Sequence, residues 1–245
     1  MKRMFLIIIT LICIFPFALS AITAEEIINR MDDAETFSTS FSRGEILSTD
    51  RFGQKSSTFN AWARGAEESL IEFTSVAERG QKVLRTKGEI YLFYPDAQEL
   101  IRLQGAALRQ SLLGSDISYE DMTGEKNTLA QYTATLEGQE SIGGRPCHII
   151  TMVAKSRTVA YPVQKIWVDM ETFMVWKAQY STQNGRLLKE MEVLGTMEVD
   201  GRILPSRTAV SDKLKKDSKT IMVLTEMQID PPLDPSIFSL QNLTW

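Results

Sequence analysis

Residues 186–211, RLLKEMEVLGTMEVDGRILPSRTAVS, decide the fold class, because two runs of β-favouring residues flank Asp200-Gly201. A dipeptide of this kind readily adopts the positive φ angles of a two-residue hairpin turn. Gly143-Gly144 and Asn184-Gly185 repeat the same signal upstream. The sequence therefore predicts strands separated by tight turns at about Tyr132–Ile142, Arg145–Ala154, Val163–Asp169, Phe173–Thr182, Arg186–Val199, Ile203–Ser211 and Thr220–Ile229.

The first half of the chain also changes to a period of two after about residue 36. Gly, Asp or Pro bounds each short run, which predicts strands at Phe37–Ser48, Ser57–Arg64, Ser69–Val76, Lys82–Arg85, Glu89–Tyr94 and Glu99–Leu103. Roughly a dozen strands joined mostly by short turns form an antiparallel meander, which must curl or close to hide its edges. No Pro/Ser-rich linker or low-complexity stretch interrupts residues 22–245, so we expect one domain.

Two segments have helical spacing instead. Thr23-Ala24-Glu25-Glu26 has the form of a capping box, and the apolar residues that follow it predict a helix to about Glu35. Gly105–Leu113 has a broad apolar stripe that includes Leu108, Leu112 and Leu113. A stripe this wide must pack on something. We interpret it as a lid on the concave face of the sheet, with ordinary core packing as the alternative.

The N-terminus is typical of an export signal. Lys2 and Arg3 precede an apolar run from Met4 to Phe15, and Ala18-Leu19-Ser20-Ala21 offers small residues for cleavage. The run is too short to span the ~30 Å of a bilayer comfortably. Cys13 follows the bulky Ile12 and so fits an acylated lipoprotein site poorly. We expect residues 1–21 to be a cleaved signal peptide and the mature chain to be periplasmic.

Charge and cysteine content limit the classes of partner. Without Lys2 and Arg3 the chain keeps 25 basic against 31 acidic side chains. This balance argues against nucleic acid and against a polybasic grip on anionic membranes. Contact with lipid would then rely on apolar burial. Cys147 is the one cysteine left after cleavage, which excludes an internal disulfide and makes a core position its expected role.

The residue patterns of common catalytic sites are absent. The sequence has no G-x-S-x-G, H-E-x-x-H, C-x-x-C or P-loop motif, and its single histidine, His148, cannot form a multi-histidine metal site. Asp116, Glu120, Asp121 and Glu125 form an acidic group, but their spacing is not that of an EF-hand. We expect no catalytic residues, metal or cofactor; an enzyme acting on lipids is the alternative that these absences disfavour.

A dozen strands enclose more space than two short helices can fill, and closed barrels above about eight strands begin to accommodate a ligand. Met, Trp, Phe and Tyr side chains on the inner face would suit a flexible apolar guest. Core packing is the alternative for each single residue. The candidates for the cavity wall are Trp62, Ile71, Phe73, Leu92, Tyr94, Met174, Trp176 and Tyr180.

Several segments together resemble the LolA-like family of outer-membrane lipoprotein-sorting proteins, which are periplasmic carriers. Gly114-Ser115-Asp116-Ile117-Ser118-Tyr119-Glu120-Asp121 is the most specific of them. The others gain weight from their order along the chain: Glu78-Arg79-Gly80, Lys82-Val83-Leu84-Arg85, Tyr91-Leu92-Phe93-Tyr94-Pro95, Trp167-Val168-Asp169 and Pro231-Pro232-Leu233-Asp234 before Phe238.

The resemblance implies an unclosed β-barrel with an α-helical lid and a cavity for acyl chains. It also implies a strand arginine held against lid carbonyls, for which Arg64 is our candidate. Lipoprotein and free lipid are both open as cargo, with an inner-membrane transporter at loading, an outer-membrane acceptor and a monomeric carrier. The same fold serves periplasmic sensors of lipid or lipoprotein that control a membrane signalling protein, which is the alternative function.

Overall fold

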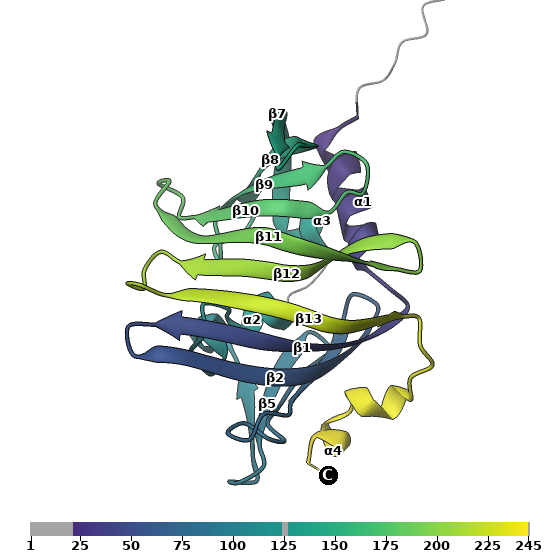
Figure 1. Cartoon of the computed structure of the whole chain (residues 1–245), viewed down its shortest axis with the longest axis vertical. Helices are drawn as coiled ribbons and strands as arrows, with labels where there is room; N and C mark the ends of the chain where they lie inside the picture. The colour runs from purple at the N-terminus through teal and green to yellow at the C-terminus, as the bar shows by residue number, and fades with distance from the viewer. Residues whose placement is uncertain (1–21, 124–126, 245) are drawn as a thin grey trace, which may run out of the picture.

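The computed structural model describes residues 22–123 and 127–244, and the expected signal peptide lies outside them. Thirteen antiparallel strands form one continuous sheet in this part of the chain (Figure 1). The strands are β1 Thr39–Asp50, β2 Gly53–Arg64, β3 Glu68–Phe73, β4 Lys82–Thr86, β5 Glu89–Tyr94, β6 Glu99–Leu103, β7 Tyr132–Ile142, β8 Arg145–Ala154, β9 Val163–Asp169, β10 Val175–Ser181, β11 Leu187–Val199, β12 Arg202–Asp212 and β13 Lys219–Ile229. The predicted β-rich class and strand number are confirmed.

The strand order is β6-β5-β4-β3-β2-β1-β13-β12-β11-β10-β9-β8-β7, so the sheet is two meanders joined where β1 pairs with β13. β6 and β7 are the two edges and do not pair with each other, which leaves the barrel unclosed. These edge strands are consecutive in the sequence. The segment between them, residues 104–131, must therefore run from one edge of the sheet to the other.

Two of the three predicted dipeptides form two-residue hairpin turns, whereas at Asn184-Gly185 only Gly185 has a positive φ, of 82°. Gly143 and Gly144 have φ angles of 58° and 84°, and Asp200 and Gly201 have φ angles of 50° and 75°. Two consecutive positive φ angles are the backbone of a type I′ turn, whose twist matches that of the strands on either side. The turn chemistry thus sets the register of the β7–β8 and β11–β12 hairpins.

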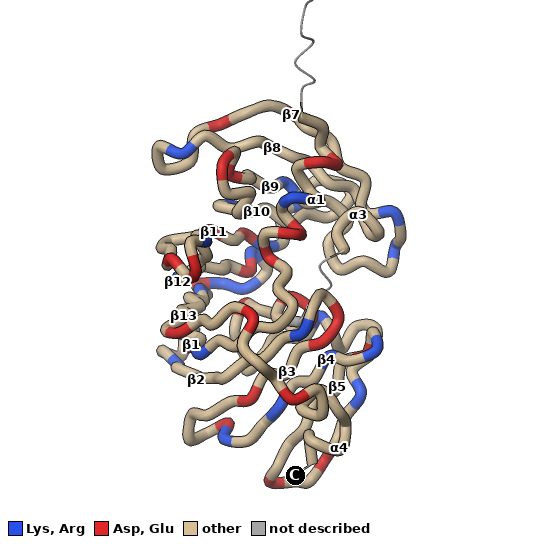
Figure 2. The backbone as a smooth tube through the Cα atoms, turned by 90° about the vertical axis from the view of Figure 1, so that its right-hand side faces the viewer, with Lys and Arg blue, Asp and Glu red and all other residues tan. Residues whose placement is uncertain are grey.

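The first helix is confirmed as α1, Ala24–Glu35, with Thr23 as its N-cap. The Thr23 hydroxyl accepts a hydrogen bond of 3.1 Å from the Glu26 amide, which satisfies an otherwise unpaired donor of the first turn. α1 buries Ile27, Ile28 and Met31 against β7–β10. Figure 2 shows α1 beside the short helix α3, Thr128–Gln131, on the same side of these strands.

The predicted continuous helix Gly105–Leu113 is wrong. Two 3₁₀ turns, η1 Gly105–Arg109 and η2 Leu112–Gly114, occupy this stretch, and Leu113 has a φ of 53°. A helix this short is marginal alone, so packing on the sheet decides its conformation. Here Leu112 is fully buried, and Ser111 pairs with Ser118 in a β-bridge. The helix α2, Tyr119–Thr123, follows.

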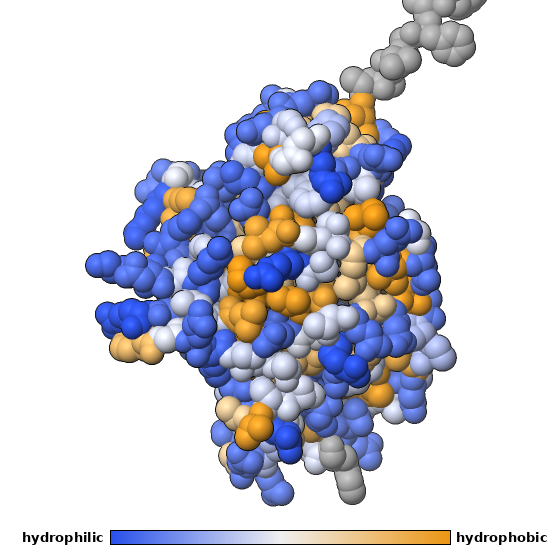
Figure 3. All heavy atoms as spheres, viewed as in Figure 1, coloured by the Kyte–Doolittle hydropathy of each residue, from blue (hydrophilic) through white to orange (hydrophobic). Residues whose placement is uncertain are grey.

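In three of the hydrophobic clusters, a different segment of the chain packs against the sheet. One lies between α1 and β7–β10, and another packs η1, η2 and α2 against the inner side of β1–β6. A third covers the opposite side of β2–β5 with the C-terminal η3, Pro235–Phe238, and α4, Leu240–Leu243. Figure 3 shows apolar side chains gathered on the face toward the viewer as well. Within residues 22–123 and 127–244, no helix has the length and apolar character needed to cross a membrane.

Candidate functional site

A pocket of about 430 Å³ lies on the helix-covered side of the sheet, between the two inner clusters. This volume is at the lower end of the range for small-molecule sites. Its apolar wall comes from α1, the segment between β6 and β7, the loop after β8 and strands β8–β13. The apolar residues are Met31, Ile117, Met122, Met152, Val159, Ala160, Ile166, Val175, Ala178, Met191, Val193, Pro205, Val210 and Met222. Five flexible methionines among them can adapt their shape to an apolar guest.

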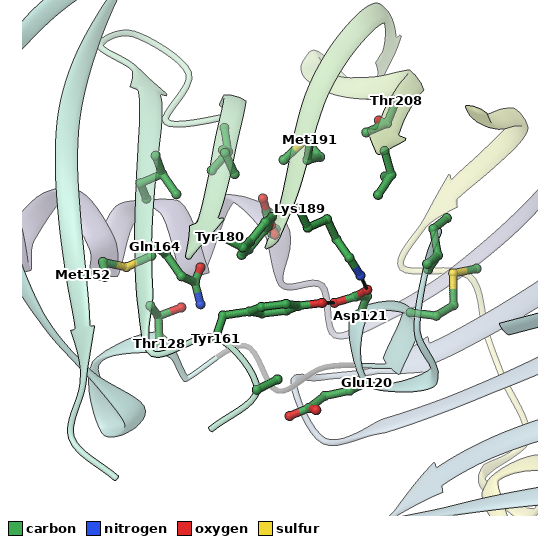
Figure 4. Close-up of a pocket in the computed structure, with 18 of the residues that line it drawn as sticks. Glu120, Asp121, Thr128, Met152, Tyr161, Gln164, Tyr180, Lys189, Met191 and Thr208 are labelled. Carbon is green, nitrogen blue, oxygen red and sulfur yellow. Dashed lines mark hydrogen bonds and ion pairs between the residues drawn. The ribbon is translucent and has the colours of Figure 1, made fainter. Parts of the chain in front are cut away.

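One end of the pocket is polar and built around Asp121 of α2 (Figure 4). Its carboxylate accepts hydrogen bonds of 2.8 Å from the Tyr161 hydroxyl and from the Ser118 amide, and it pairs with the Lys189 ammonium. The Lys189 side chain on β11 is only 9% exposed. A charge buried to this degree needs a partner, and Asp121 supplies it.

Aromatic rings complete this end of the pocket. Tyr161 and Tyr180 have ring centroids 4.6 Å apart, and the Lys189 ammonium lies 5.3 Å from the Tyr161 ring centroid. Burial, together with the nearby Asp121 carboxylate, raises the pKa of Tyr161 and Tyr180. Burial also raises the pKa of Tyr132 to about 12. These phenols stay protonated near neutral pH, and the hydroxyls of Tyr132 and Tyr161 donate hydrogen bonds to the Tyr161 carbonyl and to Asp121.

A second acidic residue fastens the other end of the same segment. Asp116 is buried, and its carboxylate accepts hydrogen bonds of 2.7 Å from the Ser218 hydroxyl and 3.3 Å from the Thr220 hydroxyl. The Lys215 ammonium lies 3.5 Å from it. We call residues 114–121 the strap, since Asp116 ties this segment to β13 and Asp121 ties it to β11. The structural role of these two aspartates gives a physical reason for the most specific sequence motif, residues 114–121.

Two further contacts hold the segment between β6 and β7 across the opening of the sheet. Arg109 donates a hydrogen bond of 2.9 Å to the Thr158 carbonyl in the loop between β8 and β9. Thr128 donates bonds of 2.9 Å and 2.7 Å, from its amide and its hydroxyl, to the Asp32 carboxylate on α1. Side-chain contacts, rather than backbone pairing, therefore close this side of the molecule.

Of the predicted cavity residues, Tyr180 lines the pocket. The structure brings another set together in the inner cluster of β1–β6: Ile71, Phe73, Leu92, Tyr94, Leu108, Leu112 and Leu113. These residues fill the space between the sheet and the 3₁₀ turns. None of them lines the pocket.

The predicted positions of Met174 and Trp176 are wrong. Both belong to a separate cluster with Cys147 and Trp167. The Trp176 indole donates a hydrogen bond of 2.9 Å to the Asp169 carboxylate. The Arg145 guanidinium lies 4.4 Å from the centroid of the Trp176 ring. The cause is a shift in the β9–β10 register between Val175 and Lys177, which breaks the alternation along β10. As a result Val175, and not Trp176, lines the pocket with Ala178 and Tyr180.

Trp62 and Arg64 lie on the opposite side of β2, beside the C-terminal segment. Arg64 donates a hydrogen bond of 2.6 Å to the Glu68 carboxylate, and its guanidinium lies 5.3 Å from the centroid of the Phe238 ring. The predicted contact of Arg64 with lid carbonyls is therefore wrong. The strand alternation places residues 62 and 64 away from Phe59, which faces the inner cluster. Arg85 on β4 is a buried strand arginine, and it donates a hydrogen bond of 3.0 Å to the Ala66 carbonyl.

We expect Trp176→Phe to lower the free energy of unfolding by about 2 kcal/mol without changing the affinity of the pocket for an apolar probe. The substitution removes a buried hydrogen bond to a carboxylate, which is worth roughly 1.5–3 kcal/mol. Urea denaturation measures the stability, and titration with a fluorescent fatty acid measures the binding. A several-fold loss of affinity in the folded variant would show that Trp176 lines the pocket after all.

Three residues at the polar end were missed as site residues: Tyr161, Lys189 and Gln164. The sequence indicates Asp121 only as a member of an acidic group and of the most specific motif, without its partners. A lysine in an otherwise alternating strand was the available signal for Lys189, but exposed lysines are common in strands. Among the residues that the structure describes, no group of three or more His, Cys, Asp or Glu side chains is arranged to hold a metal.

Comparison with known proteins identifies related chains and folds. A family model described as "Uncharacterized protein"-like matches residues 65–245. A DUF1329 family protein from Desulfovibrio piger superposes with a TM-score of 0.83 at 22% identity, covering 90% of this chain and 97% of the other. No curated protein matches the sequence.

Two other solved structures share the fold. A domain from Vibrio parahaemolyticus, named for outer membrane lipoprotein sorting, has a TM-score of 0.80 at 16% identity and covers 90% and 97% of the two chains. The LolA superfamily protein NE2245 from Nitrosomonas europaea has a TM-score of 0.76 at 24% identity, covering 91% and 100%. The unclosed barrel expected from the family resemblance is therefore confirmed as the fold.

Proposed function

Because this chain belongs to the protein family whose model matches residues 65–245 and has the fold of the LolA superfamily, we propose that it is a periplasmic carrier of acyl chains. It binds a lipid, or the lipid part of a lipoprotein, and takes part in transport toward the outer membrane. The observation that carries this proposal is the apolar pocket on the inner side of an unclosed sheet.

The pocket suits binding better than catalysis. Its wall is mainly aliphatic and thioether side chains, which bury an acyl chain without making directional contacts. Each methylene removed from water contributes about 0.8 kcal/mol, so one chain supplies enough free energy for stable binding. The strongest polar groups, Asp121 and Lys189, are paired with each other at one end. The name of the Vibrio parahaemolyticus domain, which refers to lipoprotein sorting, agrees with this use of the fold.

A carrier of this design needs help at both membranes. An acyl chain gains almost nothing on moving from a bilayer to an apolar pocket, because both surroundings are apolar. The protein therefore shields cargo in transit, and an energised inner-membrane transporter loads it before an outer-membrane acceptor receives it. Cargo reaches the pocket when the strap and the η1–η2 turns move away from the sheet.

The test begins with protein purified from the periplasm. We expect intact-mass analysis to place the mature N-terminus near residue 22, mass spectrometry to find co-purifying lipid, and a delipidated sample to bind a fluorescent fatty acid at one site per chain. The reasons are the signal sequence and a pocket with room for one chain. Protein that carries no lipid and does not bind the probe would contradict the proposal.

A further inference from the structure

Three polar side chains form a row across the inner face of strands β9, β10 and β11. In the register of the sheet, Tyr180 lies opposite Gln164 on one side and opposite Lys189 on the other. Directly opposed residues of antiparallel strands point to the same face, with Cβ atoms about 4.5–5.5 Å apart. All three residues line the pocket (Figure 4). We call Gln164, Tyr180 and Lys189 the polar row.

The next row on the same face is apolar. Two residues along each strand from the polar row, Ala178 lies opposite Ile166 and Met191. These three residues also line the pocket. The wall thus changes from hydrogen-bonding to apolar side chains along the direction of the strands. An amphiphile bound there would place its head at the polar row and its chain beside Ala178.

The polar row has hydrogen-bond donors that the protein does not use. The Lys189 ammonium has three N–H donors, and its one hydrogen-bond partner within residues 22–123 and 127–244 is Asp121. The Tyr180 hydroxyl makes no hydrogen bond with the residues that the structure describes, although its ring packs on Tyr161. A buried donor without a partner costs free energy, which an acceptor on a ligand would recover. The polar row therefore suits a head that carries acceptor oxygens.

The charges of the wall argue against an anionic head. Lys189 is the one cationic side chain among the described residues that line the pocket, and Asp121 already neutralises it. Glu35 and Glu120 are further acidic residues of the wall. A phosphate or carboxylate would face these like charges in a partly buried space, where water and salt screen the repulsion poorly. An uncharged head with acceptor oxygens gains the hydrogen bonds and avoids this repulsion.

We propose that the pocket selects a single-chain acylglycerol, with its chain beside Ala178 and its uncharged glyceryl ester against the polar row. This inference rests on the proposed function and names its ligand class. The ester carbonyl accepts a hydrogen bond from Lys189 and a glycerol hydroxyl accepts one from Tyr180, while the Gln164 carboxamide can both donate and accept. The volume of about 430 Å³ suits one acyl chain rather than several.

The experiment compares two lipids that differ by one phosphate group, 1-lauroylglycerol and 1-lauroylglycerol 3-phosphate. Each competes with a fluorescent fatty acid for the delipidated mature protein at pH 8. The chain supplies most of the affinity, so the fatty acid serves as the probe. We expect the uncharged lipid to displace the probe at a concentration about fivefold lower or less, because it brings no anion to the acidic wall.

The outcomes separate the two proposals. Equal displacement by the two lipids, or tighter binding of the phosphate lipid, would overturn the selection of an uncharged head. A bound probe that 1-lauroylglycerol fails to displace would overturn the ligand class. A probe that does not bind at all would instead contradict the acyl-carrier function.

Substitutions locate the head. Tyr180→Phe removes one hydroxyl and keeps the ring, so it should weaken the binding of 1-lauroylglycerol several-fold and narrow its advantage over the phosphate lipid. The matched control is Tyr91→Phe on β5, which removes a hydroxyl that donates to Glu89. Tyr91 lies outside this pocket and outside a second pocket of about 360 Å³ between β4–β6 and η1, so neither affinity should change.

The charge of the wall is tested separately. Glu120→Gln removes one acidic group and should strengthen the binding of the phosphate lipid several-fold more than that of 1-lauroylglycerol. Glu198→Gln, at an exposed residue of β11 outside both pockets, should change neither affinity. Thermal unfolding checks that each variant is folded. A folded Tyr180→Phe protein with the affinity and selectivity of the wild type would show that the head does not lie at the polar row, and would overturn the proposal.

Discussion

Replacing Ala178 by phenylalanine is expected to lower the affinity for a fluorescent fatty acid at least tenfold. Ala178 is on β10, is 1% exposed and faces the pocket between Val175 and Tyr180. A phenyl ring at this position projects into the space that the acyl chain would occupy. A tenfold loss corresponds to about 1.4 kcal/mol, less than the burial of two methylene groups. Equilibrium titration on delipidated protein measures the effect.

The control is Ala63→Phe, because Ala63 is a half-buried alanine of β2 that lines neither pocket. Both variants add the same group to a strand, and overpacking can cost each about 1–3 kcal/mol of stability. Thermal unfolding separates that cost from the effect on binding. Should Ala178→Phe fold and bind the probe as tightly as Ala63→Phe, the pocket is not where the chain is held.

The second large effect is expected at the pair that fastens the strap. Asp121→Asn should lower the free energy of unfolding by about 3 kcal/mol, because it leaves the buried Lys189 ammonium without its anionic partner. The double variant Asp121→Asn with Lys189→Met should recover much of this loss, since it removes the uncompensated charge. Urea denaturation of the four proteins of this cycle measures the coupling between the two side chains.

A matched control is Glu226→Gln, which breaks the solvent-exposed ion pair between Glu226 on β13 and Arg43 on β1. An exposed pair of this kind is worth about 0–1 kcal/mol, so little change is expected. Hydrogen exchange should also become faster over residues 114–121 in Asp121→Asn, since the strap loses one of its two fastenings. Simple additivity of the two single substitutions would show that Asp121 and Lys189 do not depend on each other.

Local chemistry accounts for the parts of the fold that could be predicted. The capping box at Thr23, the positive φ angles at Gly143-Gly144 and Asp200-Gly201, and the alternation along the strands all act between residues close in the chain. Alternation along β3 places Ile71 and Phe73 in the inner cluster and Leu70 in the cluster on the opposite side of the sheet. These features identified a meander of about a dozen strands before any tertiary contact was known.

Predictions from local chemistry failed where contacts between residues distant in the sequence determine the conformation. The segment 105–113 is too short to hold a helix, and its packing on β1–β6 replaces the helix with two 3₁₀ turns. The face that Trp176 occupies depends on how β10 pairs with β9, since one extra residue in β10 reverses the alternation. Arg64 and Arg85 are both strand arginines, and the sheet alone decides which of them is buried.

By itself, then, the sequence determined the β-rich class, the first helix, the hairpin turns and the resemblance to lipoprotein-sorting carriers. Only the tertiary structure decided where the pocket lies and what closes it. Asp121 is 40 residues from Tyr161 and 68 residues from Lys189 along the chain. These side chains meet because the segment between β6 and β7 crosses the open sheet, and no pattern between neighbouring residues records such a crossing. A buried charge finds its partner in space, so the polar end of the site becomes visible only once the strands are in place.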